Sequence, residues 1–87
     1  MAIINGQTSV GTAATALDGV HTNPSRIIIH NLDNTDSCYI GNSSVTITNG
    51  LELMKQETLE IQLEPLEQIY AVSTKTGHKI SWLRQTV

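Results

Sequence analysis

The sequence has little cysteine, few aromatic side chains and few charges. Its single cysteine, Cys38, excludes an intrachain disulfide and a cysteine-based zinc site. Because Cys38 precedes Tyr39 and Ile40 in a segment typical of a strand, we expect it to be a small buried apolar residue. The isoleucine run 27–29 has three residues, and no apolar run approaches the length of a membrane span. The first residues lack the features of a cleaved signal peptide, so we expect a soluble protein from a reducing compartment.

Charged residues make up only 15% of the chain, and the net charge is −3. The five cationic side chains are scattered along the sequence, at Arg26, Lys55, Lys75, Lys79 and Arg84. Nucleic-acid binders cluster such residues against phosphates, so we expect no nucleic-acid partner. Residues 52–67 contain five glutamates and one lysine. Such a cluster is typical of a solvated face, and it could also steer docking onto a basic partner.

The remaining composition favours β-structure. The chain has 11 threonines and 10 isoleucines, whose branched side chains fit a pleated sheet better than a helix. Turn residues recur mostly every 8–12 positions. We therefore predict an all-β fold: a single small antiparallel β-sandwich, jelly-roll or Ig-like, with seven to eight short strands. Its division would be an N-terminal arm over residues 1–8 and a β-sandwich domain over residues 9–87.

Three segments define the expected strands most clearly. Apolar residues alternate with polar ones over residues 58–64, which predicts a half-buried strand with Leu59, Ile61 and Leu63 facing the core. Good helix formers over 51–64 make a helix the competing interpretation. The apolar run at 26–32 predicts either a central strand buried on both faces or a core strand between two sheets. Residues 45–48 also alternate, and the Asn49–Gly50 pair predicts a tight hairpin into the next strand.

No pattern in the sequence predicts catalysis, a cofactor or a bound metal. The three histidines lack metal-ligand spacing, and we expect them in loops or on strand surfaces. Segment 31–36 is rich in Asn and Asp but lacks the calcium-loop length, glycine and terminal Glu, so we expect a turn. Nucleophile-elbow and phosphate-loop motifs are also missing. We therefore expect no enzyme, and we expect Trp82 to lie in the core or an interface.

The N-terminal segment supplies the candidate partner contacts, Ile3, Ile4 and Gln7. In an extended chain the two adjacent isoleucines point to opposite faces, so one of them would be exposed on a monomer. We expect the arm to pack against a neighbouring subunit or a larger assembly. The alternative is that it folds back as an edge strand of its own domain.

The order of several motifs resembles that of a known group of proteins. The motifs are SVGTAAT at 9–15, RIIIHNL at 26–32, CYIGNSSVT at 38–46, NGLEL at 49–53, TLEI at 58–61 and IYAVS at 69–73. Together they resemble the small β-sandwich proteins of tailed-bacteriophage structural modules. One departure is the segment 54–57, where the resemblance leads us to expect a glycine-containing turn.

The resemblance implies a structural protein of the virion. The expected role is a capsid decoration, or cement, protein that binds the assembled head and stabilises it. Its expected partners are the major capsid protein and copies of itself, as a homo-oligomer. It would be made in the bacterial host cytoplasm and reside on the capsid surface. The alternative is a small tail or head-fibre module that mediates assembly or host-surface binding.

Overall fold

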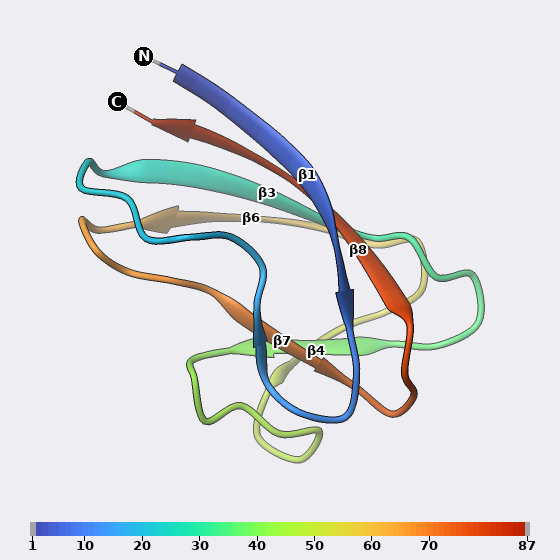
Figure 1. Cartoon of the computed structure of the whole chain (residues 1–87). Coiled ribbons are helices and arrows are strands. Elements are labelled where there is room, and N and C mark those ends of the chain that lie inside the picture. The colour runs from blue at the N-terminus through green and yellow to red at the C-terminus, as the bar shows by residue number, and fades with distance from the viewer. Residues whose placement is uncertain (1, 87) are drawn as a thin grey trace.

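The computed structural model describes residues 2–86 and is a sandwich of two antiparallel sheets, with no helix in that range (Figure 1). Sheet A has the strand order β1-β8-β3-β6, and sheet B has the order β2-β7-β4-β5. The strands are β1 (Ala2–Val10), β2 (Thr15–Ala16), β3 (Ser25–Asn31), β4 (Cys38–Gly41), β5 (Leu51–Leu53), β6 (Thr58–Leu63), β7 (Tyr70–Ser73) and β8 (His78–Thr86). The predicted all-β sandwich and its strand number are confirmed.

Strand β3 supplies the centre of the core. Ile27 and Ile29 are fully buried between the sheets, whereas Ile28 is 36% exposed on the opposite face. The run of three isoleucines therefore belongs to a strand with one buried face and one solvent-exposed face. Cys38 is buried in the same core, as predicted.

Strand β6 has the predicted register, and the helical interpretation of residues 51–64 is wrong. Leu63 is buried, and Leu59 and Ile61 are partly buried against the core. Their burial is incomplete because β6 is an edge strand of sheet A. The polar residues between them lie on the exposed side.

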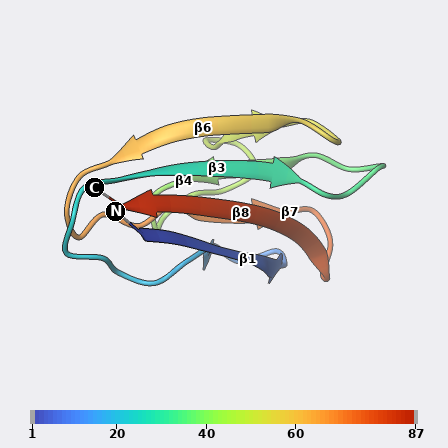
Figure 2. The same cartoon turned by 90° about the horizontal axis from the view of Figure 1, so that it is seen from above.

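The N-terminal segment is not a separate arm. Residues 2–10 form strand β1, which pairs with β8 in a continuous register of nine residue pairs and lies at one edge of sheet A (Figure 2). The proposed boundary between residues 8 and 9 falls inside this strand, and Met1 lies outside the described residues. At Gly6 the strand lies close against Trp82 of β8, where an added Cβ would be 2.9 Å from the ring.

Residues 45–48 do not form the predicted strand. Asn49 Oδ1 accepts the backbone N–H of Thr46 at 2.7 Å, and the N–H of Gly50 bonds to the Thr46 carbonyl at 3.0 Å. These bonds close a turn within residues 46–50, so the alternating segment becomes part of the β4–β5 loop. The side chain of Val45 is nevertheless buried.

Two turns of the same design flank β6. Gln56 and Leu66 adopt positive φ values of 60° and 70°. In each turn the fourth residue bonds back through its side chain: Glu57 accepts the N–H of Met54 and Glu67 accepts that of Glu64, both at 2.7 Å. The turn at 54–57 thus forms without the expected glycine, because Gln56 itself adopts the left-handed conformation.

Candidate functional site

The outer face of sheet A is a candidate surface for a partner. Its exposed positions follow from the register and the alternation of burial in the four strands. Across β1, β8, β3 and β6 they form three main rows: Ile3–Gln85–Arg26–Gln62, Asn5–Leu83–Ile28–Glu60 and Gln7–Ser81–His30–Thr58. Apolar side chains occupy only three of these positions, Ile3, Leu83 and Ile28.

A shallow depression of about 390 Å³ lies on this face. Leu83 and Ile28 line it together with the polar side chains of Asn5, Gln7 and His30. Nδ1 of His30 lies 2.9 Å from the Thr58 hydroxyl, so that ring is tied to the neighbouring strand. The depression offers an apolar centre with polar groups around it, which is the composition of many partner-binding patches.

The three predicted partner contacts do not share one surface. Ile3 is 63% exposed on the outer face, and Gln7 is exposed on the same face. Ile4 points inward opposite Arg84 and is half-buried. The expectation that one of the two adjacent isoleucines is exposed is confirmed. The structure places Gln7, but not Ile3 or Ile4, in the lining of the depression.

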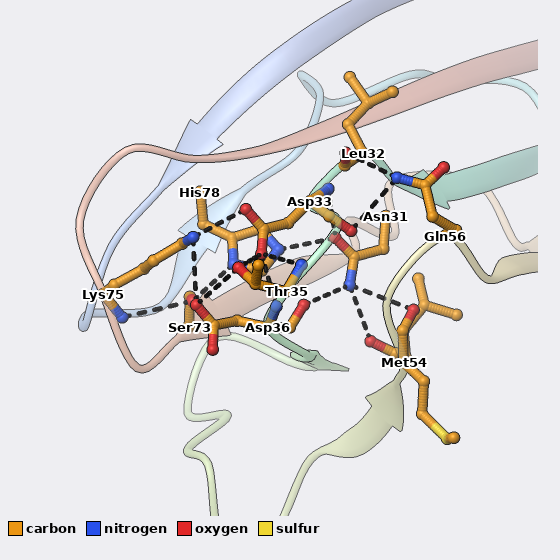
Figure 3. A network of polar contacts seen from close by, with 11 residues as sticks. Asn31, Leu32, Asp33, Thr35, Asp36, Met54, Gln56, Ser73, Lys75 and His78 are labelled. Atoms are coloured by element: carbon orange, nitrogen blue, oxygen red, sulfur yellow. Dashed lines mark hydrogen bonds and ion pairs between the residues drawn. The ribbon is translucent and has the colours of Figure 1, made fainter.

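A second candidate site is a buried polar network near one end of the sandwich (Figure 3). His78 is fully buried, with Nδ1 2.7 Å from the Ser73 hydroxyl and Nε2 2.7 Å from Asn31 Oδ1. The Asn31 amide nitrogen donates to the backbone carbonyls of Asp36, Leu53 and Met54. Asn31 Oδ1 is therefore the acceptor, and His78 donates from Nε2.

An ion-pair cluster borders this network towards solvent. Lys75 Nζ lies 2.7 Å from Asp33 and 3.1 Å from Asp36. The ammonium of Lys75 and the N–H of Asp36 hold the pKa of Asp33 well below its usual range, and the carboxylates raise the pKa of Lys75. Asp33 also accepts the backbone N–H groups of Thr35 and Asp36. The predicted turn is confirmed, and a lysine occupies the position between its two carboxylates.

A third polar group fills the opposite end of sheet A. The buried guanidinium of Arg84 donates to Asp18 at 3.2 Å and to the Gly19 carbonyl at 3.1 Å. His21 lies 2.9 Å from the same carboxylate. Asp18, Gly19 and His21 come from the loop before β3, whereas Arg84 belongs to β8. The loop covers the inner face of sheet A where sheet B does not reach (Figure 1). The group anchors that loop to the sheet.

The chemistry of these groups is structural in the described conformation. Ser73, His78 and Asn31 form a hydroxyl–imidazole–amide series, but their side chains are at most 1% exposed, so no substrate reaches the hydroxyl. Burial raises the pKa of the Cys38 thiol to about 12, which keeps it protonated and unreactive. Within residues 2–86 no group of three or more metal-ligating side chains is gathered, and no helix is long and apolar enough to cross a membrane.

Sequence reasoning missed the buried network. His78 was expected in a loop or on a strand surface, and that expectation is wrong. The last strand contains a signal for this burial. Ile80 and Trp82 share its inward face, and residues 78 and 84 lie at the same two-residue spacing, so they point inward as well. His30, in contrast, does lie on a strand surface.

Comparisons with known proteins identify the fold but no family. No family model and no curated protein sequence matches the chain. A solved structure from Bacillus endospore appendages, described as a novel family of disulfide-linked pili, is similar with a TM-score of 0.62. The match covers 99% of this chain and 86% of that one, at 8% sequence identity. At this identity the similarity shows a shared sandwich fold only.

Proposed function

We propose that this protein is a structural component of a tailed-bacteriophage virion, a decoration protein that binds the assembled capsid. The motif order that resembles phage structural modules supports this role. The structural observation that carries it is the outer face of sheet A, where Leu83 and Ile28 line a depression surrounded by polar side chains. In this role the major capsid protein occupies that depression.

The mechanism would be stabilisation by mass action. A subunit that contacts neighbouring capsid proteins binds the assembled shell and not its separated parts, so its binding free energy adds to the stability of the shell. A rigid surface suits this task because little conformational entropy is lost on docking. The outer face of sheet A is rigid in this sense, since all four of its strands are hydrogen-bonded into one sheet.

The second candidate is a tail or head-fibre module, and the fold similarity to a pilus protein favours it. That protein belongs to disulfide-linked pili. The single cysteine of this chain is buried and protonated, so a fibre made of it would be held by non-covalent contacts.

Copy number in purified virions separates the two roles. Quantitative gels should show hundreds of copies per particle for a decoration protein, because the symmetry of the shell repeats its binding site. A tail or fibre role predicts far fewer copies, and absence from virions would refute both.

A matched pair of variants tests the surface. Leu83→Ser removes an apolar side chain from the depression, and Leu66→Ser makes the same change at an exposed turn outside it. We expect Leu83→Ser to reduce the amount bound to capsids stripped of the protein, and Leu66→Ser to bind like the wild type. Equal binding by both variants would show that this face is not the docking surface.

A further inference from the structure

The two edges of sheet A differ sharply in charge. Strand β1 forms one edge, and β6 forms the other. Residues 1–17 contain no charged side chain and no proline. Strand β6 carries Glu60, and glutamates 57 and 64 lie beside its two ends. Soluble proteins usually protect an edge strand with charge, proline or a bulge. Strand β1 has none of these, since its register with β8 is continuous.

The unprotected part of β1 is its N-terminal half. Towards the other end, the Thr8 hydroxyl donates to the Leu17 carbonyl at 2.7 Å, and Gly11 accepts the N–H of Ser73 at 2.8 Å. These contacts cover the edge where the chain crosses to sheet B. Among the described residues, no strand pairs with β1 on the side away from β8. The backbone of residues 2–7 is therefore the open edge.

We propose that this edge pairs with the same edge of a second copy, giving an antiparallel β1–β1 dimer. Like charges that come together across a strand pair are destabilising, and in a two-fold pair residue i faces residue j while j faces i, so any charge on the strand would occur twice in the seam. An uncharged strand avoids this repulsion. The inference does not depend on the phage role, because it concerns the isolated chain.

The distribution of charge favours pairing of two copies through β1 over pairing through β6. Each chain carries a net charge of −3, with a −4 cluster within residues 52–67. That cluster includes β6, which is the strand farthest from β1 in sheet A. Strands are about 4.8 Å apart, so a β1–β1 seam separates the two β6 strands by about 34 Å. This distance exceeds the screening length of about 8 Å at physiological salt. Pairing through β6 would instead bring the glutamates together.

The geometry of such a dimer is defined by the strand pairing. The two-fold axis runs perpendicular to the sheet, so the two copies of sheet A join into one continuous sheet. Both outer faces then point to the same side, and the two depressions lie on one surface. Ile3 lies beside the seam and its exposed side chain gains contacts there. The dimer closes on itself, because both copies use the same edge of sheet A.

The expected affinity is modest. The open edge, residues 2–7, is about 20 Å long, and a sheet is about 10 Å thick. The contact therefore buries about 400 Å² in total, well below the roughly 1,200 Å² of a standard stable interface. We expect dimerisation at high micromolar concentration. The fraction of paired copies should be higher wherever a larger assembly raises the local concentration.

Sedimentation velocity of the full chain, from about 10 µM to about 1 mM, tests the proposal. Gln7 and Gln62 are both exposed on the outer face, in β1 and in β6 respectively. Gln7→Lys therefore places a charge in the seam, and Gln62→Lys makes the same change at the opposite edge. We expect wild type and Gln62→Lys to approach a dimer as concentration rises. Gln7→Lys should weaken dimerisation at least about tenfold, with an unchanged unfolding midpoint.

Amide hydrogen exchange gives an independent readout on the wild-type chain. Protection of residues 2–7 should increase with concentration, whereas protection of β6 should not. The proposal is overturned if the wild type stays monomeric at the highest concentration, or if Gln7→Lys associates like Gln62→Lys. Growth beyond a dimer would also overturn it, because the proposed β1–β1 contact joins two copies only.

Discussion

Asn31 Oδ1 accepts a hydrogen bond from Nε2 of His78 at 2.7 Å, and both side chains are fully buried. The pair fixes the neutral tautomer of the imidazole, because Nδ1 is left to accept from the Ser73 hydroxyl. That hydroxyl in turn lies 3.4 Å from the backbone N–H of Lys75, which can only donate. Every proton in this series has one consistent position when His78 is neutral. Protonation at Nδ1 would force the Ser73 hydroxyl to turn its proton away and accept from both the imidazolium and the Lys75 N–H.

The first prediction concerns the pH dependence of stability. Burial lowers the pKa of His78 from 6.5, while the nearby Asp33 and Asp36 act in the opposite direction and Lys75 acts with burial. The unfolded chain therefore binds a proton before the folded chain does. As pH falls below about 6.5, the free energy of unfolding should decrease, with a slope of at most about 1.4 kcal/mol per pH unit from this group. Urea titrations between pH 8 and pH 5 measure the slope.

A matched pair of variants assigns that slope to His78. His78→Gln removes the titrating group and should lower stability at pH 8, yet flatten the decline between pH 7 and pH 5. His30→Gln makes the same change on the exposed face and should keep the decline. Asp33 contributes in the same direction only at lower pH, because its pKa is held below its usual value of 3.8. A full slope in His78→Gln would contradict the assignment.

The sequence was sufficient for features that depend on local periodicity. The alternation at residues 58–63 gave the correct register because half-buried strands repeat every two residues. The Asn- and Asp-rich turn was also predictable, since those side chains bond to their own backbone. Pairings between strands that lie far apart in the sequence could not be predicted. Whether β1 joins β8 depends on contacts 84 residues apart, such as Ala2 with Thr86, which no local pattern encodes.

The buried polar residues show the same limit. Residue type alone predicts that Arg84 and His78 lie at the surface, because charged and polar side chains are usually exposed. They are buried here because distant segments supply their partners, such as Asp18 for Arg84 and Asn31 for His78. The predicted strand at 45–48 was wrong for the converse reason. The alternation of its residues is typical of a strand, but the Asn49 side chain closes a local turn there.

The second prediction compares two isoleucines of sheet A. Ile27 is fully buried in the central strand β3, and Ile61 is partly buried opposite it in the edge strand β6. Ile27→Ala should cost about 3–4 kcal/mol of stability, and Ile61→Ala about 1–2 kcal/mol. Glu60→Ala, which removes only an exposed ion pair with Arg26, should cost less than about 0.5 kcal/mol. Denaturant unfolding measures all three, and equal costs for the two isoleucines would disprove the edge position of β6.

The third prediction uses the two turns with positive φ. Leu66→Gly relieves a left-handed conformation that costs a branched residue about 1–2 kcal/mol, and the exposed leucine side chain loses little packing. After the entropic cost of glycine, the variant should gain about 0.5–1 kcal/mol.

Gln56→Gly is the contrasting variant. It relieves the same strain but removes the hydrogen bonds from the Gln56 amide to the carbonyls of Leu32 and Asp33. We expect no net gain from it in thermal unfolding. A larger gain for Gln56→Gly than for Leu66→Gly would mean that those two bonds contribute nothing.

The last prediction tests how β1 lies on Trp82, the one tryptophan of the chain. A Cβ at Gly6 would approach Cζ2 of that ring to 2.9 Å, closer than side-chain carbons normally come. Gly6→Ala must therefore displace the ring and strain its 3.0 Å bond to the Thr8 hydroxyl. We expect a loss of about 1–3 kcal/mol, the usual cost of overpacking, and a shift in tryptophan fluorescence. Gly19→Ala is the control, because a Cβ there meets no atom within 4 Å, and it should change neither quantity. If Gly6→Ala is as stable as wild type and keeps its emission spectrum, β1 does not pack on Trp82 as described.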